Sequence, residues 1–456
     1  MASTRQRAVC GFALLLVGIL SLLASMRYRE RYRLSMDPIM RSSRGRACKP
    51  DTKVAFIKLH KTGGSTIMQV LHRFGYLRNL SYVQPSGNNI NQLYPYGLQD
   101  IRKYLPPEEK EFDILTYHTI YDRPRITKLL SQNATFVTIL REPMERLKSA
   151  FNYYQLARRF RIPGPNALKT FLENPGRYDN KVDVRSSGAP ISATKNPMAV
   201  ELGFPLKDLP FNHSTAVKEQ NIRDFVDKIS REFGLVMVTE YFDESLVLLR
   251  RLLCWDMQDI LYFKYNSYEY ELRKNTVPEH LVQNYRQHDA IDYALYDHFN
   301  RTLWGKINMA GSNFQEELAH FRWLQAKMRT HCNREFYDFA PMYIGETAWN
   351  AGFHIDSTFC TWMKTWHMCY FTLLRDRNVR IQQDKQKIPR ARRLPRTGGI
   401  YSDPYCVLCE NIKKHCTVHE YVTHLYHEGF LSPSQSSSSK ITSIKSRHGG
   451  KPQPIS

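Results

Sequence analysis

The stretch that decides the fold runs from Val54 to Thr66 and reads VAFIKLHKTGGST. Its first four residues are apolar and favour strands, so they predict a buried β-strand. Two glycines then form a turn. The apolar residues that follow share one face of a predicted helix: Ile67, Val70, Leu71 and Phe74. A strand, a glycine turn and an amphipathic helix in this order predict the first unit of a parallel sheet.

Three later apolar runs continue this alternation of strands and helices, at residues 112–117, 136–140 and 235–238. The pattern predicts an α/β fold, with a central parallel β-sheet flanked by helices. Residues 155–215 contain many Pro, Gly and Asn, so we expect a long loop region there that shapes the acceptor site. Beyond about residue 335 the βα pattern fades.

Composition narrows the class of partner without naming it. The 456 residues include 65 Lys and Arg against 43 Asp and Glu, a formal net charge of +22. This length bounds the chain to one or two domains. The charge favours an anionic partner: a nucleotide, an acidic glycan, nucleic acid or a membrane surface. Part of the excess lies in Arg27–Arg46 and Arg375–Arg396, so a solvated stem and loop account for it equally well.

Residues 8–26 form an uncharged apolar run close to the length that spans a bilayer. A cleaved signal peptide is the alternative, but the run is longer than a usual signal core and favours an uncleaved anchor. The arginines at 27–33 would place the bulk of the chain in the cytosol by the positive-inside rule. Four N-glycosylation triplets favour a lumenal body instead, at Asn79, Asn133, Asn212 and Asn300.

The nine cysteines favour disulfides over metal ligands if the body is lumenal. Their pairing cannot be read from the sequence. The segment Cys406–His419 contains Cys and His at spacings that fit no common zinc finger, so zinc is the weaker interpretation there.

The segment Lys58–Thr66 (KLHKTGGST) has the composition of an anion-binding loop. Glycine lets a backbone close around phosphate oxygens, and the helix that follows offers free N–H groups and the positive end of its dipole. Lys61 adds a positive charge. This lysine precedes the glycines, whereas the Walker A lysine follows them, which counts against a P-loop kinase. A plain strand–turn–helix corner is the remaining alternative.

The second motif is Leu140–Ser149 (LREPMERLKS), at the end of another predicted strand. Pro143 suits the first turn of a helix. Arg141 at the strand end can bind a phosphate through two hydrogen bonds, and Ser149 can donate a third. Alone this motif is weak, because a surface arginine and a serine on a helix are common.

Together the two motifs resemble the donor site of sulfotransferases that use 3′-phosphoadenylyl sulfate (PAPS). The chain resembles the Golgi galactose-3-O-sulfotransferase family over residues 53–310. Later blocks also resemble this family: ESLVLL at 244–249, LCW at 253–255 and YFKYN at 262–266. The resemblance implies a P-loop-like sulfotransferase fold, a single-pass type II topology in the Golgi membrane and a lumenal catalytic domain.

The resemblance also assigns residues. It implies that the 5′-phosphosulfate of PAPS is bound by Lys61, Thr62, Gly63, Gly64, Ser65 and Thr66. Arg141 and Ser149 would bind the 3′-phosphate. No metal is expected. The expected order along the chain is a cytoplasmic tail (1–7), anchor (8–26), stem (27–52), catalytic domain (53–335), C-terminal extension of the lumenal domain (336–431) and disordered tail (432–456).

Sulfuryl transfer needs a group that stabilises the leaving nucleotide and a base for the acceptor hydroxyl. Lys61 suits the first role. His118 and His60 compete for the second. We favour His118, because it follows a predicted strand and can reach the shared sheet edge, whereas His60 would orient the donor. No acidic residue stands at a comparable place in the sequence.

We therefore expect an enzyme that sulfates a galactose-terminated glycolipid or glycan, at the 3-hydroxyl. Two alternatives stay open: a sulfotransferase for glycosaminoglycan hydroxyls, and a lumenal glycan-binding protein without catalysis. Beyond the acceptor and the membrane around its anchor, we expect no nucleic-acid partner, and a homodimer is left open.

Overall fold

The structure, a computed structural model, describes residues 48–84, 111–179, 192–205, 219–264, 276–333, 340–365, 370 and 373–374. Several predicted features lie outside these residues: the anchor at 8–26, most of the stem, Asn212, Arg375–Arg396, Cys406–His419 and the tail at 432–456. No helix in the described ranges combines the length and the apolar character that crossing a bilayer requires.

Four parallel strands form the central sheet, in the order β2-β1-β3-β4. Their bounds are Val54–Ile57 (β1), Ile114–Leu115 (β2), Thr135–Leu140 (β3) and Leu235–Val238 (β4). This confirms the predicted α/β class and all four strands. The second is shorter than predicted because only Ile114 and Leu115 pair with β1, whereas the N–H of Phe112 donates to the carbonyl of Leu129.

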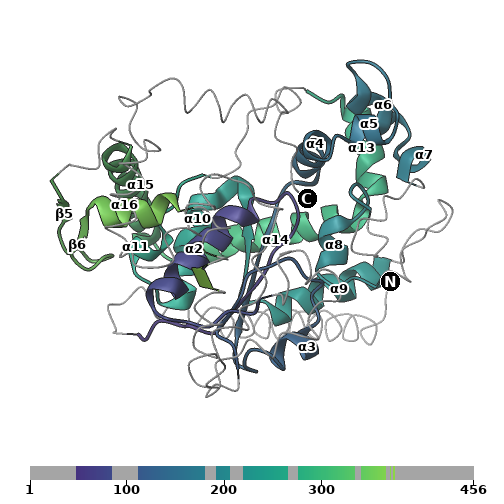
Figure 1. Ribbon diagram of the computed structural model, residues 1–456. Helices are drawn as coiled ribbons and strands as arrows, with labels where there is room; N and C mark the ends of the chain where they lie inside the picture. Colours follow the sequence, from purple (N-terminus) through teal and green to yellow (C-terminus); the bar gives the residue numbers. More distant parts are fainter. Residues whose placement is uncertain are drawn as a thin grey trace, which may run out of the picture.

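Helices cover both sides of this sheet. Figure 1 shows α2 and α10 on one side and α3 and α9 on the other. The longer described helices are α2 (Gly64–Leu77), α4 (Pro143–Tyr153), α9 (Glu219–Glu232), α10 (Phe242–Leu253), α13 (Glu279–His288), α14 (Ala290–Met309) and α15 (Asn313–Cys332). The shorter ones are α3 (Arg123–Thr127), α5 (Leu156–Arg159), α6 (Ala167–Glu173), α7 (Pro175–Asp179), α8 (Pro197–Glu201), η6 (Thr239–Tyr241), α11 (Met257–Ile260) and α16 (Ser357–Lys364).

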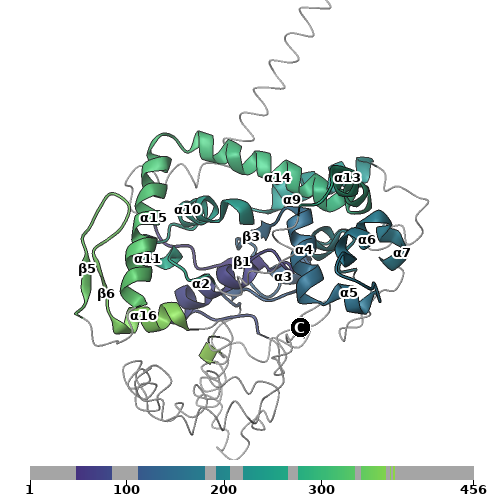
Figure 2. The ribbon, with the colours of Figure 1, turned by 90° about the horizontal axis from the view of Figure 1, so that it is seen from above.

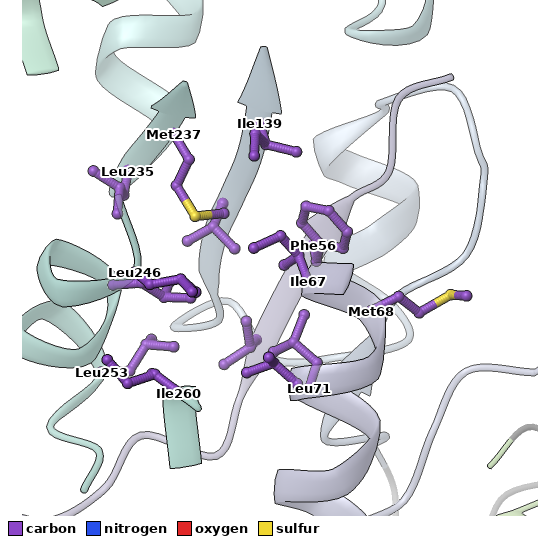
Figure 3. Close-up of a cluster of buried hydrophobic side chains, with 14 of the residues drawn as sticks. Phe56, Ile67, Met68, Leu71, Ile139, Leu235, Met237, Leu246, Leu253 and Ile260 are labelled. Atoms are coloured by element: carbon purple, nitrogen blue, oxygen red, sulfur yellow. The ribbon is translucent and has the colours of Figure 1, made fainter. Parts of the chain in front are cut away.

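The main core lies between α2, α10 and the sheet. In Figure 3, Ile67 and Leu71 of α2 and Leu246 of α10 point toward Met237 of β4. All four side chains are fully buried. The predicted apolar face of α2 is therefore the face that the sheet buries, and α10 buries apolar side chains in the same core. Burial of this kind is the main force that holds a helix on a sheet.

The prediction of a long loop at residues 155–215 is wrong for the described part of this range, which contains α5, α6, α7 and α8. Apolar side chains there form a second cluster with α4 and α13: Phe151, Phe160, Leu168, Phe171 and Tyr285 are among its buried members. Figure 2 shows these helices grouped at one end of the molecule. Tertiary burial of these aromatics outweighs the loop signal of the nearby Pro, Gly and Asn residues.

The described part of the predicted C-terminal extension packs on the same core as the sheet. Strands β5 (Met342–Ile344) and β6 (Phe353–Ile355) form an antiparallel hairpin, and α16 follows it. Gln69 of α2 donates to the carbonyl of Met363 at 3.0 Å. The described part of the extension therefore shares the hydrophobic core of the central sheet.

Two disulfides join distant parts of the chain. Cys48 pairs with Cys254, across 206 residues, and Cys332 pairs with Cys360, across 28 residues. The first ties the segment before β1 to the end of α10, and the second ties α15 to α16. Four of the nine cysteines thus behave as the lumenal interpretation expected.

We expect the double substitution Cys48→Ser with Cys254→Ser to lower the free energy of unfolding by about 2–5 kcal/mol, because the disulfide restricts the unfolded chain. Thermal unfolding of the two proteins measures this, with the reductant-treated parent as the control. Equal melting temperatures for all three would show that the Cys48–Cys254 bond does not stabilise the fold.

Candidate active site

The predicted site residues meet at the carboxyl edge of the sheet. Strand β1 lies between β2 and β3, so the strand order reverses at β1. Ligands of open α/β sheets bind outside the carboxyl ends of the strands at such a switch point. The segment Lys58–Thr66 follows β1, His118 follows β2, and Arg141 follows β3. The sheet therefore brings together groups that are far apart in the sequence.

The loop after β1 is held in one conformation. Gly63 precedes α2 with φ 80°, and Lys61 has φ 67°, which is the left-handed region. The hydroxyl of Thr62 donates to the carbonyl of Leu59 at 3.3 Å, and the Thr62 carbonyl lies 2.6 Å from Oγ1 of Thr239. A non-glycine residue stays in this backbone region only where its surroundings fix it.

Gly64 allows a close approach at the first turn of α2. A Cβ atom at this position would lie 3.0 Å from Cγ of Lys58. Glycine therefore lets the buried Lys58 side chain pass beneath the helix terminus. Thr62 and Thr66 are buried, Ser65 is half-buried and Gly63 is exposed. Of the glycines in the motif, Gly63 is the one whose backbone faces solvent.

Positive charge gathers at this loop. Nζ of Lys61 lies 3.5 Å from the centre of the Tyr153 ring, and Nη1 of Arg141 donates to the Lys61 carbonyl at 3.4 Å. Burial, then the cations Arg141, Arg146 and Lys58, lower the pKa of Lys61 to about 7. Lys61 and Arg141, which come from two different motifs, are thus neighbours.

These residues fit an anionic donor. Burial also lowers the pKa of Lys58 to about 8, and Glu201 opposes that shift only in part. Burial is the main cause of both shifts, and the neighbouring cations add to that of Lys61, so a bound phosphate or sulfate would favour the charged form of both lysines. Carboxylates balance only the rim: Glu145 lies 3.7 Å from Arg141 and 2.8 Å from Lys148.

Ser149, the second predicted ligand of the 3′-phosphate, lies in the second turn of α4 and is buried. Helix α4 begins where predicted, with Pro143 in its first turn and Glu142 as its N-cap, whose carboxylate accepts from the N–H of Glu145 at 2.7 Å. Arg141 immediately precedes this cap. Of the two predicted 3′-phosphate ligands, Ser149 therefore lies on α4 and Arg141 lies in the short connection between β3 and α4.

The two candidate bases are stacked on each other. The rings of His60 and His118 are 3.7 Å apart between centroids and 10° from parallel. Nδ1 of His118 lies 2.8 Å from the carbonyl oxygen of Lys58. On the far side, Nδ1 of His60 bonds to Oε1 of Glu201, and the His60 backbone N–H donates to Oε2 of Glu201 at 2.8 Å.

His60, His118 and Glu201 bring possible metal-ligand atoms within 4.8 Å of one another. Two features oppose a metal here. Stacked rings direct their nitrogen lone pairs side by side, whereas ligands of a tetrahedral ion must converge. Lys58 also competes for the charge of Glu201. We do not assign these residues as metal ligands.

The expectation that no acidic residue is placed comparably to the two histidines is wrong, because Glu201 bonds to His60. It ends α8, is buried and lies 141 residues from His60 in the chain. No spacing rule links two such residues, and α8 falls in the region that the composition predicted to be a loop. Tyr153, which covers Lys61, was missed for a similar reason, since an aromatic on an apolar helix face reads as core.

The glycosylation triplets differ in their surroundings. Asn79 and Asn133 are exposed. Asn300 lies inside α14, and its side-chain oxygen is buried. An attached glycan needs an exposed asparagine, so Asn79 and Asn133 suit N-glycosylation better than Asn300 does.

The model of the galactose-3-O-sulfotransferase family matches residues 4–338. Galactose-3-O-sulfotransferase 3 from Mus musculus is 35% identical over 286 residues, 62% of this chain and 63% of that protein. Galactosylceramide sulfotransferase from Bos taurus is 33% identical over 293 residues, 62% of this chain and 65% of that protein.

Galactose-3-O-sulfotransferase 2 from Sus scrofa is 30% identical over 333 residues, 71% of this chain and 78% of that protein. The match to the first two relatives thus spans just under two thirds of their length. Because the family model covers well over half of the sequence, including both loop motifs and Glu201, the chain belongs to the galactose-3-O-sulfotransferase family.

Proposed function

We propose that this protein transfers the sulfuryl group of PAPS to the 3-hydroxyl of a terminal β-galactose, on a glycolipid such as galactosylceramide or on a glycoprotein glycan. One observation carries the proposal: Lys61 and Arg141, from separate motifs, meet at the switch point of a parallel sheet, where burial and neighbouring cations lower the pKa of Lys61. The choice of sulfuryl transfer as the reaction and of galactose as the acceptor is supported by the names of the relatives.

In this proposal the fold is the P-loop-like sulfotransferase fold, and each motif binds one end of the donor. The loop from Lys61 to Thr66 holds the 5′-phosphosulfate at the N-terminus of α2, where free backbone N–H groups favour an anion. Arg141 and Ser149 hold the 3′-phosphate. PAPS supplies the sulfuryl group, and its leaving group is adenosine 3′,5′-bisphosphate.

His118 acts as the base. A carbonyl oxygen only accepts hydrogen bonds, so the contact with Lys58 places a proton on Nδ1 of His118, and we assign Nε2 as the nitrogen that takes the acceptor proton. As the acceptor oxygen bonds to sulfur, its proton passes to Nε2. The bond from sulfur to the bridging oxygen breaks, its electron pair stays on the nucleotide, and Lys61 stabilises that charge.

The test is transfer of radiolabelled sulfate from PAPS to galactosylceramide, lactosyl, N-acetyllactosamine and glycosaminoglycan acceptors, with linkage analysis of the product. We expect 3-O-sulfated galactose. Product on the glycosaminoglycan alone would replace the proposed acceptor. If heparin but not adenosine 3′,5′-bisphosphate raised the melting temperature, the protein would be a glycan-binding protein instead.

We also propose a type II Golgi membrane protein with its catalytic domain in the lumen. The two disulfides support an oxidising compartment, and the exposed triplets at Asn79 and Asn133 suit N-glycosylation.

We expect glycans at Asn79 and Asn133 and little or none at Asn300, because α14 buries the side-chain oxygen of Asn300. Glycopeptide mass spectrometry of the protein secreted from animal cells without its anchor measures the three occupancies. Full occupancy at Asn300 alone would contradict this expectation, and a wholly unglycosylated protein would count against the lumenal location.

A further inference from the structure

The buried carboxylate of Glu201 has no assigned role in donor binding, and it bonds to the His60 ring, which stacks on the proposed base. Both of its oxygens bond to His60, one to the ring and one to the backbone N–H at 2.8 Å. His60 in turn stacks on His118, at 3.7 Å between ring centroids. Glu201, His60 and His118 thus form a compact cluster, in which possible ligand atoms of all three lie within 4.8 Å of one another.

The position of Glu201 is fixed by α8 and its neighbours. At the start of α8, the carboxylate of Asp292 accepts from the N–H groups of Met198 at 3.0 Å and Ala199 at 2.7 Å. At its end, the Glu201 carbonyl accepts from the N–H of Tyr121 at 2.9 Å. A short helix held at both ends keeps the carboxylate where His60 needs it, as a preorganised site requires.

The contacts also fix the proton on His60. A carboxylate accepts hydrogen bonds, so Nδ1 of His60 carries the hydrogen that faces Glu201. His60 and His118 then share the same neutral tautomer. If both rings were protonated, two positive charges would lie about 4 Å apart, which is strongly unfavourable away from bulk water. The stacked pair therefore accommodates one positive charge.

We propose that Glu201, acting through His60, is the positioning residue that stabilises the positive charge formed on His118 when it takes the acceptor proton. The inference rests on the proposed function, since the charge forms only during transfer. The carboxylate holds the His60 ring against the base and supplies the nearby negative charge, much as a buried acid supports the imidazole of a hydrolase.

Lys58 is the group that limits this effect. It is buried, feels the charge of Glu201, and its pKa of about 8 leaves it partly charged in the working range. In the proposed complex, the positive charge of Lys61 and the negative charges of PAPS also act on the His60–His118 pair. We therefore expect a loss on the order of 10- to 100-fold from removing the Glu201 charge, below the loss seen where an acid touches the base directly.

The test compares steady-state kinetics of Glu201→Gln with the parent protein. Glutamine keeps the shape and removes the charge, and its single amide oxygen can replace one of the two carboxylate acceptors, while its NH2 group can only donate. We expect kcat to fall 10- to 100-fold while the KM for PAPS and the melting temperature change little. Glu201→Asp should recover part of the loss. The matched control is Glu232→Gln, which removes a half-buried carboxylate that accepts from the Tyr121 hydroxyl at 2.8 Å.

A double-substitution cycle separates a role through His118 from a structural role. If Glu201 acts through the base, Glu201→Gln in a His118→Ala background should lower kcat by less than twofold. Equal losses in both backgrounds, or normal kcat in Glu201→Gln, would overturn the inference. An inactive parent protein would instead overturn the proposed function, so the two failures are distinguishable.

Discussion

Lys61→Ala is expected to lower kcat by about 10²–10³-fold, the loss found when one preorganised group that stabilises transition-state charge is removed. Alanine has the same Cβ as lysine, so the cost of the left-handed backbone, φ 67°, is unchanged. The substitution removes the side chain beyond Cβ, including the ammonium group and its contact with Tyr153. Single-turnover transfer from PAPS measures the effect on the chemical step.

The same side chain should make donor binding depend on pH. In the free pocket the pKa of Lys61 is about 7 because of burial and the neighbouring cations. An anionic ligand favours the charged lysine and raises that pKa, so binding takes up a proton above pH 7. The affinity for adenosine 3′,5′-bisphosphate should be constant below about pH 6.5 and fall as pH rises from 7 to 9.

The matched control is Lys53→Ala, at the opposite end of β1, where Nζ lies 3.0 Å from Asp113. Its kcat and its binding profile should equal those of the parent. Calorimetry in buffers of different ionisation enthalpy reports the proton uptake, which Lys61→Ala should reduce. A Lys61→Ala protein with parental kcat would remove Lys61 from the reaction.

The parts of this fold that the sequence predicted are those governed by local pattern. Strand β1 and the buried face of α2 follow from period and from two glycines within 21 residues, Val54 to Phe74. The start of α4 follows from Pro143. That Lys61 and Arg141 serve one donor site was implied by the family resemblance, and the structure brings the two residues together. The common edge of parallel strands was the reason for expecting His118 there.

What the sequence could not predict depends on packing between distant segments. Glu201 reaches His60 only because Asp292 of α14 fixes the start of α8, and neither residue stands in a recognisable motif. The second apolar cluster was missed because its aromatic residues are separated by Pro, Gly and Asn, which mask any period. Long-range burial decides such regions, and single-sequence patterns do not contain it.

His118→Ala is expected to lower kcat by about 10²–10⁴-fold, the usual contribution of a general base. A sugar hydroxyl is a poor nucleophile until its proton is removed, and Nε2 of His118 is the nitrogen that we assign to accept it, because Nδ1 bonds to the Lys58 carbonyl. Affinity for adenosine 3′,5′-bisphosphate should stay near the parental value, because the phosphate-binding roles are assigned to Lys61–Thr66, Arg141 and Ser149 and not to His118. Kinetics and calorimetry on one preparation measure both quantities.

The comparison with His60→Ala decides between the stacked rings. If His118 is the base, His60→Ala should lose less kcat, and added imidazole should restore activity to His118→Ala but not to His60→Ala. The reverse pattern would make His60, directly bonded to Glu201, the base. His354→Ala, an exposed histidine in β6, controls for nonspecific effects of imidazole. With either histidine as the base, we expect the stacked pair to carry no more than one positive charge, since the 3.7 Å spacing between the rings disfavours a second.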